Sequence, residues 1–353
     1  MLASYKERAL AHPGGIVDLS VGTPVDPVPA RVRDALAAAS DAPGYPSTAG
    51  PRALREAAAG WLARRHQVTV DPEAVLPVIG TKELIASLPT VLGCGPGDVV
   101  VHPALAYPTY DVGARLAGAR AVAADGLFSL GPEPVALCWL NSPSNPTGQV
   151  LPPEHLRKVV TWARERGTVV ASDECYIDLG WEERPVSVLH PDACDGSHHG
   201  LLAVYSLSKR STMAGYRFGF VTGDPDLIAD LLEIRKHAGM LVPTPVQAAA
   251  AAAFDDDEHA DAQRARYSAR REALRPALEA AGWAVDHSQA GLYLWVSHPE
   301  RDCWESVAML AEAGILVAPG SFYGPEGGRH VRVALTATDE RVAAAVARLA
   351  ALA

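Results

Sequence analysis

Cysteine is scarce and scattered in this sequence. The five cysteines include no C-x-x-C pair and lie far apart, at Cys94, Cys138, Cys175, Cys194 and Cys303. An odd, dispersed set argues against a disulfide framework and against a cysteine-ligated zinc site. We therefore expect reduced thiols, a cytoplasmic location and no metal among the functional residues.

Long apolar runs and basic clusters are also missing. No apolar run is long enough to cross a bilayer, and the charged residues 1–9 lack the apolar core of a signal peptide. The formal net charge of −10 argues against nucleic-acid binding. Histidines and aspartates gather between positions 190 and 199, but without ligand spacing, so we predict a solvated loop there. With 353 residues, 48% of them hydrophobic, the chain can bury a large core in one or two domains.

One lysine stands out from this background. Lys209 lies between two apolar, strand-like runs, at residues 200–205 and 218–222, with Ser206, Ser208 and Arg217 close in sequence. A lysine that forms a Schiff base needs partial burial and a nearby cation, because both lower its pKa and free its lone pair. An exposed surface lysine is the alternative explanation.

A second pattern suggests a site for an anion. Residues 74–79 are strand-like, and Gly80, Thr81 and Lys82 then open a helix with a leucine stripe. Free N–H groups and the helix dipole make such a helix start suited to phosphate. Lys82 could instead be an exposed helix residue.

Residues 135–140 and 168–172 are predicted strands, the first of them uniformly apolar, and each is followed by polar residues. Such runs indicate strands buried on both faces of a parallel sheet, where ligands gather at the carboxyl ends. The first leads to Asn145 in an N-P-T-G sequence, and the second to Asp173 and Tyr176. A simple turn for Asn145 and a helix cap for Asp173 are the alternatives. A further strand, 98–103, precedes Tyr107 and Tyr110.

The pattern of predicted helices and strands changes over the last hundred residues. A long charged helix is predicted over 258–281, and alternating strands over 283–286 and 291–296 indicate a sheet with one open face. A helix at 304–313, strands at 315–319 and 331–335 and a terminal helix complete an α+β unit. Arg332 lies on the last strand, either on a wet face or as a bidentate ligand for a carboxylate.

Taken in order, these motifs resemble the class I and II aminotransferases of fold type I, which depend on pyridoxal 5'-phosphate. The resemblance covers nearly the whole chain, although the chain is short for the family and the segment around Tyr107 is out of register. It implies an α/β fold, in which a mostly parallel seven-stranded sheet flanked by helices forms a large domain beside a smaller α+β domain. We expect an N-terminal segment (1–28) joining the small domain, a large domain (29–257) and a small domain (258–353).

The resemblance also implies roles for individual residues. Lys209, Asp173 and Tyr176 would be catalytic. Residues implied to hold the cofactor are Tyr45, Gly80, Thr81, Lys82, Tyr107, Asn145, Asp173, Tyr176, Ser206, Ser208, Lys209 and Arg217. Residues implied to bind the substrate are Gly22, in a proline-rich loop predicted over 13–30, Asn145 and Arg332. Tyr110 stays open as an alternative to Tyr107 for stacking on the cofactor.

The expected activity is transfer of an amino group between a small amino acid and a 2-oxo acid in a ping-pong mechanism. Overall similarity favours N-succinyl-LL-2,6-diaminopimelate with 2-oxoglutarate and glutamate, a reaction of lysine synthesis. Lys82 and Arg329 are candidates for reading its extra carboxylates. The alternatives are another amino donor, such as aspartate, alanine or histidinol phosphate, a carbon–sulfur lyase, and a non-catalytic cofactor-binding or regulatory protein. The resemblance further implies a homodimer in which Tyr45 crosses to the partner's active site.

Overall fold

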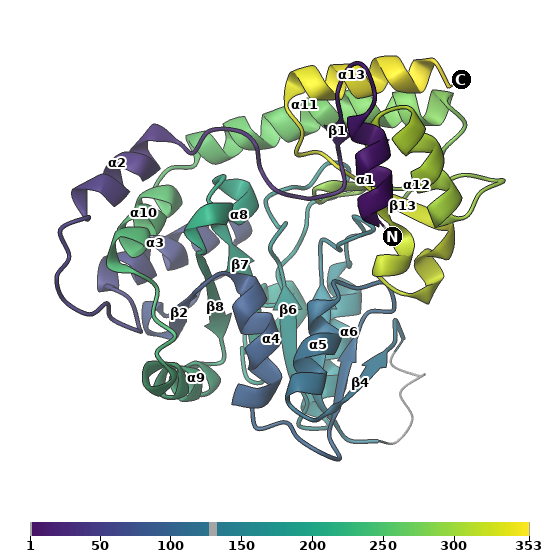
Figure 1. The fold of residues 1–353 in the computed structure, drawn as a ribbon. Helices are drawn as coiled ribbons and strands as arrows, with labels where there is room; N and C mark the ends of the chain where they lie inside the picture. The colour runs from purple at the N-terminus through teal and green to yellow at the C-terminus, as the bar shows by residue number, and fades with distance from the viewer. Residues whose placement is uncertain (1, 127–132, 353) are drawn as a thin grey trace.

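Seven strands form the largest sheet of the computed structural model, which describes residues 2–126 and 133–352 (Figure 1). Their spatial order is β2 (Val75–Val78), β8 (Gly219–Gly223), β7 (Leu201–Ser206), β6 (Val169–Asp173), β5 (Val135–Asn141), β3 (Val99–His102) and β4 (Arg120–Ala123). Strand β8 is antiparallel to both neighbours, and the other pairs are parallel. This confirms the predicted mostly parallel, seven-stranded sheet.

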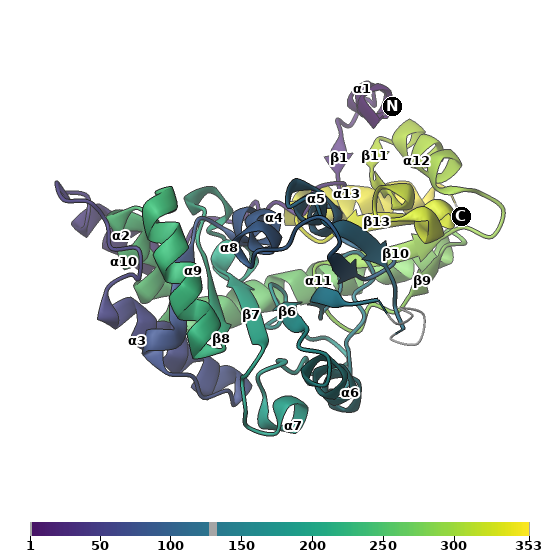
Figure 2. The ribbon, with the colours of Figure 1, turned by 90° about the horizontal axis from the view of Figure 1, so that it is seen from below.

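Helices cover both faces of this sheet (Figure 2). One face packs on α4 (Thr81–Val91), α5 (Thr109–Leu116) and α9 (Pro225–Ala238). The other packs on α2 (Ala30–Ala38), α3 (Arg52–Trp61), α6 (Pro153–Arg164), α7 (Pro191–Cys194) and α10 (Thr244–Phe254). The central strands are buried on both sides because each face meets an apolar helix layer.

A second sheet carries the C-terminal residues and is antiparallel. Its order is β12 (Ala318–Pro319), β13 (His330–Ala334), β10 (Tyr293–Ser297) and β9 (Ala284–Asp286). Helices α11 (Glu258–Ala280), α12 (Cys303–Glu312) and α13 (Asp339–Ala350) pack on one face. The predicted open face is wrong for β10, because Tyr293 to Val296 are all buried. Trp295, for example, packs against Ala318 and Tyr323.

The N-terminal residues join this second unit. Helix α1 (Leu2–Leu10) packs through Ala9 on Ala311 of α12, and β1 (Val17–Asp18) pairs in parallel with β11 (Ile315–Leu316). Two predictions need correction. The segment 13–30 holds a short strand despite its prolines, and the single strand expected at 315–319 is two strands in different sheets.

Several short helices and helical turns connect the main elements. The short helix α8 (Leu207–Arg210) follows β7 directly, and a 3-10 turn (Ala214–Tyr216) leads to β8. Other such turns are Pro72–Ala74, Gly320–Phe322 and Pro325–Arg329, and a π-helical turn spans Leu62–His66. Within the described residues, no helix is both long and apolar enough to span a bilayer.

Candidate active site

A cavity of about 650 Å³ lies where the carboxyl ends of β6 and β7 meet the second sheet. It collects residues that are far apart in the chain, from Val21 to Arg332. All of the predicted site residues line it except Gly80, Tyr45 and the candidate Arg329. The members of this set are Gly22, Thr81, Lys82, Tyr107, Asn145, Asp173, Tyr176, Ser206, Ser208, Lys209, Arg217 and Arg332.

One end of the cavity is suited to an anion. Thr81 begins α4, so its free backbone N–H groups and the helix dipole attract negative charge there. Gly80 precedes it with a φ of 72° and lies against the Arg217 guanidinium, which a side chain at position 80 would strike. Ser206 and Ser208 face the same cavity. Gly80 is therefore outside the cavity lining but needed for its shape.

Lys209 points from α8 into the cavity, where its Nζ donates to the carbonyl oxygen of Gly22. The pKa of this amine is lowered. Burial is the main cause, and the positive charges of Arg332 and Arg217 add to it, against opposing contributions from Tyr293 and Cys175. A lysine in this setting is more readily neutral than a surface lysine, which is what a nucleophile or a general base requires.

Asp173 ends β6 and is 5% exposed. Its Oδ2 accepts from the Tyr110 hydroxyl at 2.7 Å, and its Oδ1 accepts from the Cys175 backbone N–H at 3.2 Å. Burial raises the pKa of this carboxyl, while these hydrogen bonds act in the opposite direction. A buried carboxylate that already has two donors still lacks a cationic partner, and a protonated ring nitrogen would supply one.

Tyr107 and Tyr110, the two candidates for stacking on the cofactor, lie in different positions relative to the cavity. Tyr107 lines the cavity, with the Lys82 Nζ 5.6 Å from its ring centroid. Tyr110 lies behind it, fully buried, and stacks on Trp139 at 5.0 Å between centroids. Tyr107 is thus the ring available to a bound ligand, and Tyr110 acts on Asp173.

Arg332 projects from β13 into the cavity and is only 7% exposed, so it is not on a wet face. Its Nη1 donates to Asn145 Oδ1 at 2.8 Å and its Nη2 to the Ser20 carbonyl at 2.9 Å. Because the Asn145 oxygen accepts from the arginine, its Nδ2 group stays available as a donor in the cavity. These contacts join the two sheets at the site.

Sequence reasoning missed two residues that build the site. Asn141 ends β5, where its Nδ2 donates to the Asp173 carbonyl at 3.0 Å and its Oδ1 accepts from the Asn145 N–H at 2.8 Å. Its position after a buried strand, like that of Asp173, could have identified it. Tyr293, on β10, also lines the cavity.

Two predicted residues lie elsewhere. Tyr45 is 98% exposed in the loop between α2 and α3, which extends away from the rest of the chain (Figure 1). Arg329 lies outside the cavity lining and donates to the Pro299 carbonyl. Its proposed contact with a substrate carboxylate therefore has no support from the structure.

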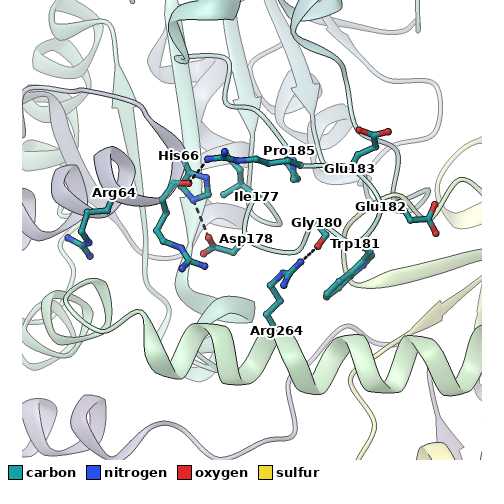
Figure 3. Close-up of a pocket in the computed structure, with 12 residues that line it drawn as sticks. Arg64, His66, Ile177, Asp178, Gly180, Trp181, Glu182, Glu183, Pro185 and Arg264 are labelled. Carbon is teal, nitrogen blue, oxygen red and sulfur yellow. Dashed lines mark hydrogen bonds and ion pairs between the residues drawn. The ribbon is translucent and has the colours of Figure 1, made fainter.

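A second hollow, of about 450 Å³, contains none of the predicted residues (Figure 3). Two of its side chains are already engaged: His66 Nε2 is 3.1 Å from Asp178 Oδ1, and the Arg264 guanidinium donates to the Gly180 carbonyl. Among the described residues, no group of three or more His, Cys, Asp or Glu side chains could hold a metal ion.

Comparison with known proteins identifies the family. The model of the class I and II aminotransferases matches residues 15–349. The chain belongs to this family. The probable aminotransferase Rv1178 of Mycobacterium tuberculosis is 66% identical over 99% of this chain and 83% of its own length. The 4-dedimethylamino-4-oxo-anhydrotetracycline transaminase OxyQ of Streptomyces rimosus is 62% identical, over 99% and 97%.

The fold agrees with that of solved aminotransferases. A probable N-succinyldiaminopimelate aminotransferase from Thermus thermophilus superposes with a TM-score of 0.89 at 28% identity, covering 100% of this chain and 99% of the other. The aminotransferase is therefore a member of a family that depends on pyridoxal phosphate.

The residues present fit this cofactor. The anion end, with Gly80 close against Arg217, has the shape and charge for a phosphate group. The buried Asp173 is a partner for a ring nitrogen, and the amide of Asn145 and the hydroxyl of Tyr176 are donors for a ring oxygen. When bound, pyridoxal phosphate supplies an electron sink for bonds to the substrate α-carbon.

Proposed function

We propose that this aminotransferase exchanges the amino group of N-succinyl-LL-2,6-diaminopimelate with 2-oxoglutarate and glutamate. The observation that carries this proposal is Lys82, an exposed helix residue that also lines the cavity and whose ammonium group has no carboxylate partner in the described part of the chain. Its neighbour Glu83 is bound instead to Arg235, with N–O distances of 2.7 and 2.9 Å. Each of these substrates carries carboxylates beyond the one on its α-carbon, and Lys82 would bind one of them. The name of the Thermus thermophilus neighbour supports the same donor.

The proposed roles follow from the contacts. Arg332 and Asn145 bind the α-carboxylate of the substrate, because the guanidinium offers a rigid bidentate fork. Lys209, as a neutral amine, accepts the proton from the substrate α-carbon and later returns one. Asp173 holds a proton at the ring nitrogen of the cofactor, and Tyr176 donates to its ring oxygen.

We also propose a homodimer. Tyr45 is exposed and does not line its own cavity, and the family resemblance assigns its hydroxyl to the cofactor phosphate in a second copy. Tyr45→Phe should then weaken cofactor binding in the dimer. Mixing Tyr45→Phe with Lys209→Ala chains tests this directly, because only the crossed arrangement builds one intact site from two defective chains.

The first experiment is a half-reaction followed by absorbance. The cofactor-loaded enzyme is mixed with one donor at a time: glutamate, N-succinyl-LL-2,6-diaminopimelate, aspartate, alanine, histidinol phosphate or cystathionine. Rapid conversion to the aminated cofactor by the first two compounds alone supports the proposal. Preference for another donor rejects the substrate and retains the enzyme class. Release of ammonia and pyruvate without consumption of a 2-oxo acid would support a carbon–sulfur lyase.

Lys82 is tested in the same assay. Lys82→Met should lower kcat/KM for glutamate and for the succinylated donor by about 10-fold while changing alanine little, because one charge-assisted contact is lost. Lys158→Met, on the exposed side of α6, is the matched control. Equal losses for alanine and glutamate would refute a side-chain role for Lys82.

A second candidate is amination of a ketone on a large polycyclic substrate. The observation that favours it is the 62% identity to OxyQ over nearly its whole length. An assay with glutamate as donor and a polycyclic ketone as acceptor tests this candidate. Turnover of that ketone faster than of 2-oxo acids would replace the diaminopimelate proposal.

A further inference from the structure

Tyr293 lies at the centre of the substrate end of the cavity, although no motif pointed to it. It is 4% exposed on β10, and its ring centroid lies 3.8 Å from the Arg332 guanidinium carbon. Its hydroxyl is 3.2 Å from the Tyr176 hydroxyl and packs directly on Gly22, where any side chain would collide with it. One residue thus contacts the proposed carboxylate site and a proposed cofactor ligand.

The ring of Tyr293 determines how Arg332 is presented. The guanidinium lies against Tyr293 and also contacts the Tyr323 ring, at 4.8 Å from its centroid. Two of its nitrogens donate to Asn145 and Ser20, whereas the buried Nε has no hydrogen-bond partner in the described structure. Because Arg332 lines the cavity, this N–H is left for a ligand there. The aromatic contact holds the guanidinium plane in place for it.

The hydroxyl of Tyr293 acts on Tyr176. Burial alone raises the pKa of the Tyr293 phenol, but Arg332, Lys209 and the Tyr176 hydrogen bond outweigh it and lower the net value. The pKa of Tyr176 is raised, mainly by burial. The two hydroxyls therefore share one hydrogen bond whose direction can change. If the single O–H of Tyr176 donates a hydrogen bond to a cofactor oxygen, Tyr293 must be the donor in the hydrogen bond between the two tyrosines.

We propose that Tyr293 is a positioning residue that joins the carboxylate-binding site to the cofactor-binding hydroxyl. Its ring holds Arg332 flat for the substrate α-carboxylate, and its hydroxyl donates to Tyr176 and strengthens the bond from Tyr176 to the cofactor. This inference depends on aminotransferase activity and not on the identity of the amino donor, so any donor that the enzyme accepts can test it.

Two substitutions separate the roles of the ring and the hydroxyl. Tyr293→Phe keeps the ring, so KM for glutamate or for the accepted donor should change less than about 2-fold, while kcat falls roughly 10-fold. The absorbance of the lysine-bound cofactor should titrate at higher pH, by about half a unit, because Tyr176 becomes a weaker donor. Tyr293→Leu removes the ring, and KM for carboxylate substrates should rise about 10-fold or more.

A matched control and a cofactor-free readout complete the test. Tyr205→Phe removes another buried phenol, whose hydroxyl is 2.9 Å from Ser187 outside the cavity. It should lower the melting temperature without shifting the cofactor titration. In the cofactor-free protein, near-ultraviolet titration should show one tyrosine that ionises below the others and is lost in Tyr293→Phe. The inference is overturned if Tyr293→Phe leaves both titrations unchanged, or if Tyr293→Leu lowers kcat alone.

Discussion

Tyr110→Phe tests the electrostatic support of the buried Asp173. The substitution removes one hydroxyl from a fully buried residue and leaves its ring on Trp139, so the packing is retained. The lost group donates to Asp173 Oδ2 at 2.7 Å. Without it, the ionised carboxylate loses a donor and the protonated form is favoured. The pKa of Asp173, already raised by burial, should rise further.

The size of this effect follows from the contact. A hydrogen bond to a charged acceptor contributes roughly 1.5–3 kcal/mol, which corresponds to a 10- to 100-fold change in the proton affinity of Asp173. A proton held by Asp173 is not held at the ring nitrogen of the cofactor. We therefore expect kcat at neutral pH to fall by about 10-fold or more, with the acid limb of the pH profile displaced to higher pH.

The assay is kcat against pH with one donor at saturation, for wild type, Tyr110→Phe and Tyr205→Phe. Tyr205→Phe loses a buried hydroxyl from the adjacent strand β7, so it controls for a general loss of stability. Tyr110→Phe should differ from it by its displaced acid limb. A Tyr110→Phe profile that superposes on that of the control would refute the link between Tyr110, Asp173 and catalysis.

Three further outcomes are expected. Lys209→Ala should abolish turnover while the cofactor stays bound without a covalent link, as its absorbance would show; sustained turnover would exclude Lys209 as the base. Arg332→Lys should raise KM for every amino donor by roughly 10- to 100-fold, because an ammonium lacks the bidentate fork, and an unchanged KM would contradict its role. Burial raises the pKa of Asp26, but hydrogen bonds from Arg270 and Gln263 leave it lowered overall. Asp26→Asn should therefore cost about 3 kcal/mol of unfolding free energy at neutral pH, and this difference should vanish in acid as Asp26 of the wild type is protonated. Denaturant unfolding at several pH values measures it, and a pH-independent difference would contradict the ionic explanation.

The sequence predicted most strands of the large sheet because they are largely apolar, but it did not predict the edge strand β4, none of whose residues is buried. Strands buried on both faces, such as β5 and β6, have no competing pattern, and their ends place Asn145 and Asp173 next to the cavity. The glycine turn before α4 was equally clear. These features depend on local composition and on the general behaviour of parallel sheets, so a single sequence contains them.

The second sheet was harder, because its burial depends on distant contacts. The strand β10 was interpreted as half-exposed, yet Tyr293 faces the cavity and Trp295 packs on Tyr323. The apolar residues 293–296 are a local sign that both sides are covered, but the sequence does not show which elements cover them. The choice between Tyr107 and Tyr110 was open for the same reason, since only the packing of α5 places one ring in the cavity and the other behind it.

The two adjacent cations at positions 209 and 210 show how a reactive lysine can move on a rigid backbone. Arg210 is 4% exposed and does not line the cavity, and it binds Asp178 at 2.9 Å and Asp257 at 3.2 Å. The Lys209 carbonyl also accepts from the Tyr267 hydroxyl at 3.3 Å. The Lys209 backbone and the neighbouring Arg210 are therefore held in place, whereas among the described residues the Lys209 amine makes one hydrogen bond, to the Gly22 carbonyl. A lysine that must bind the cofactor and then move a proton needs this combination, because its side chain changes position while its Cα does not.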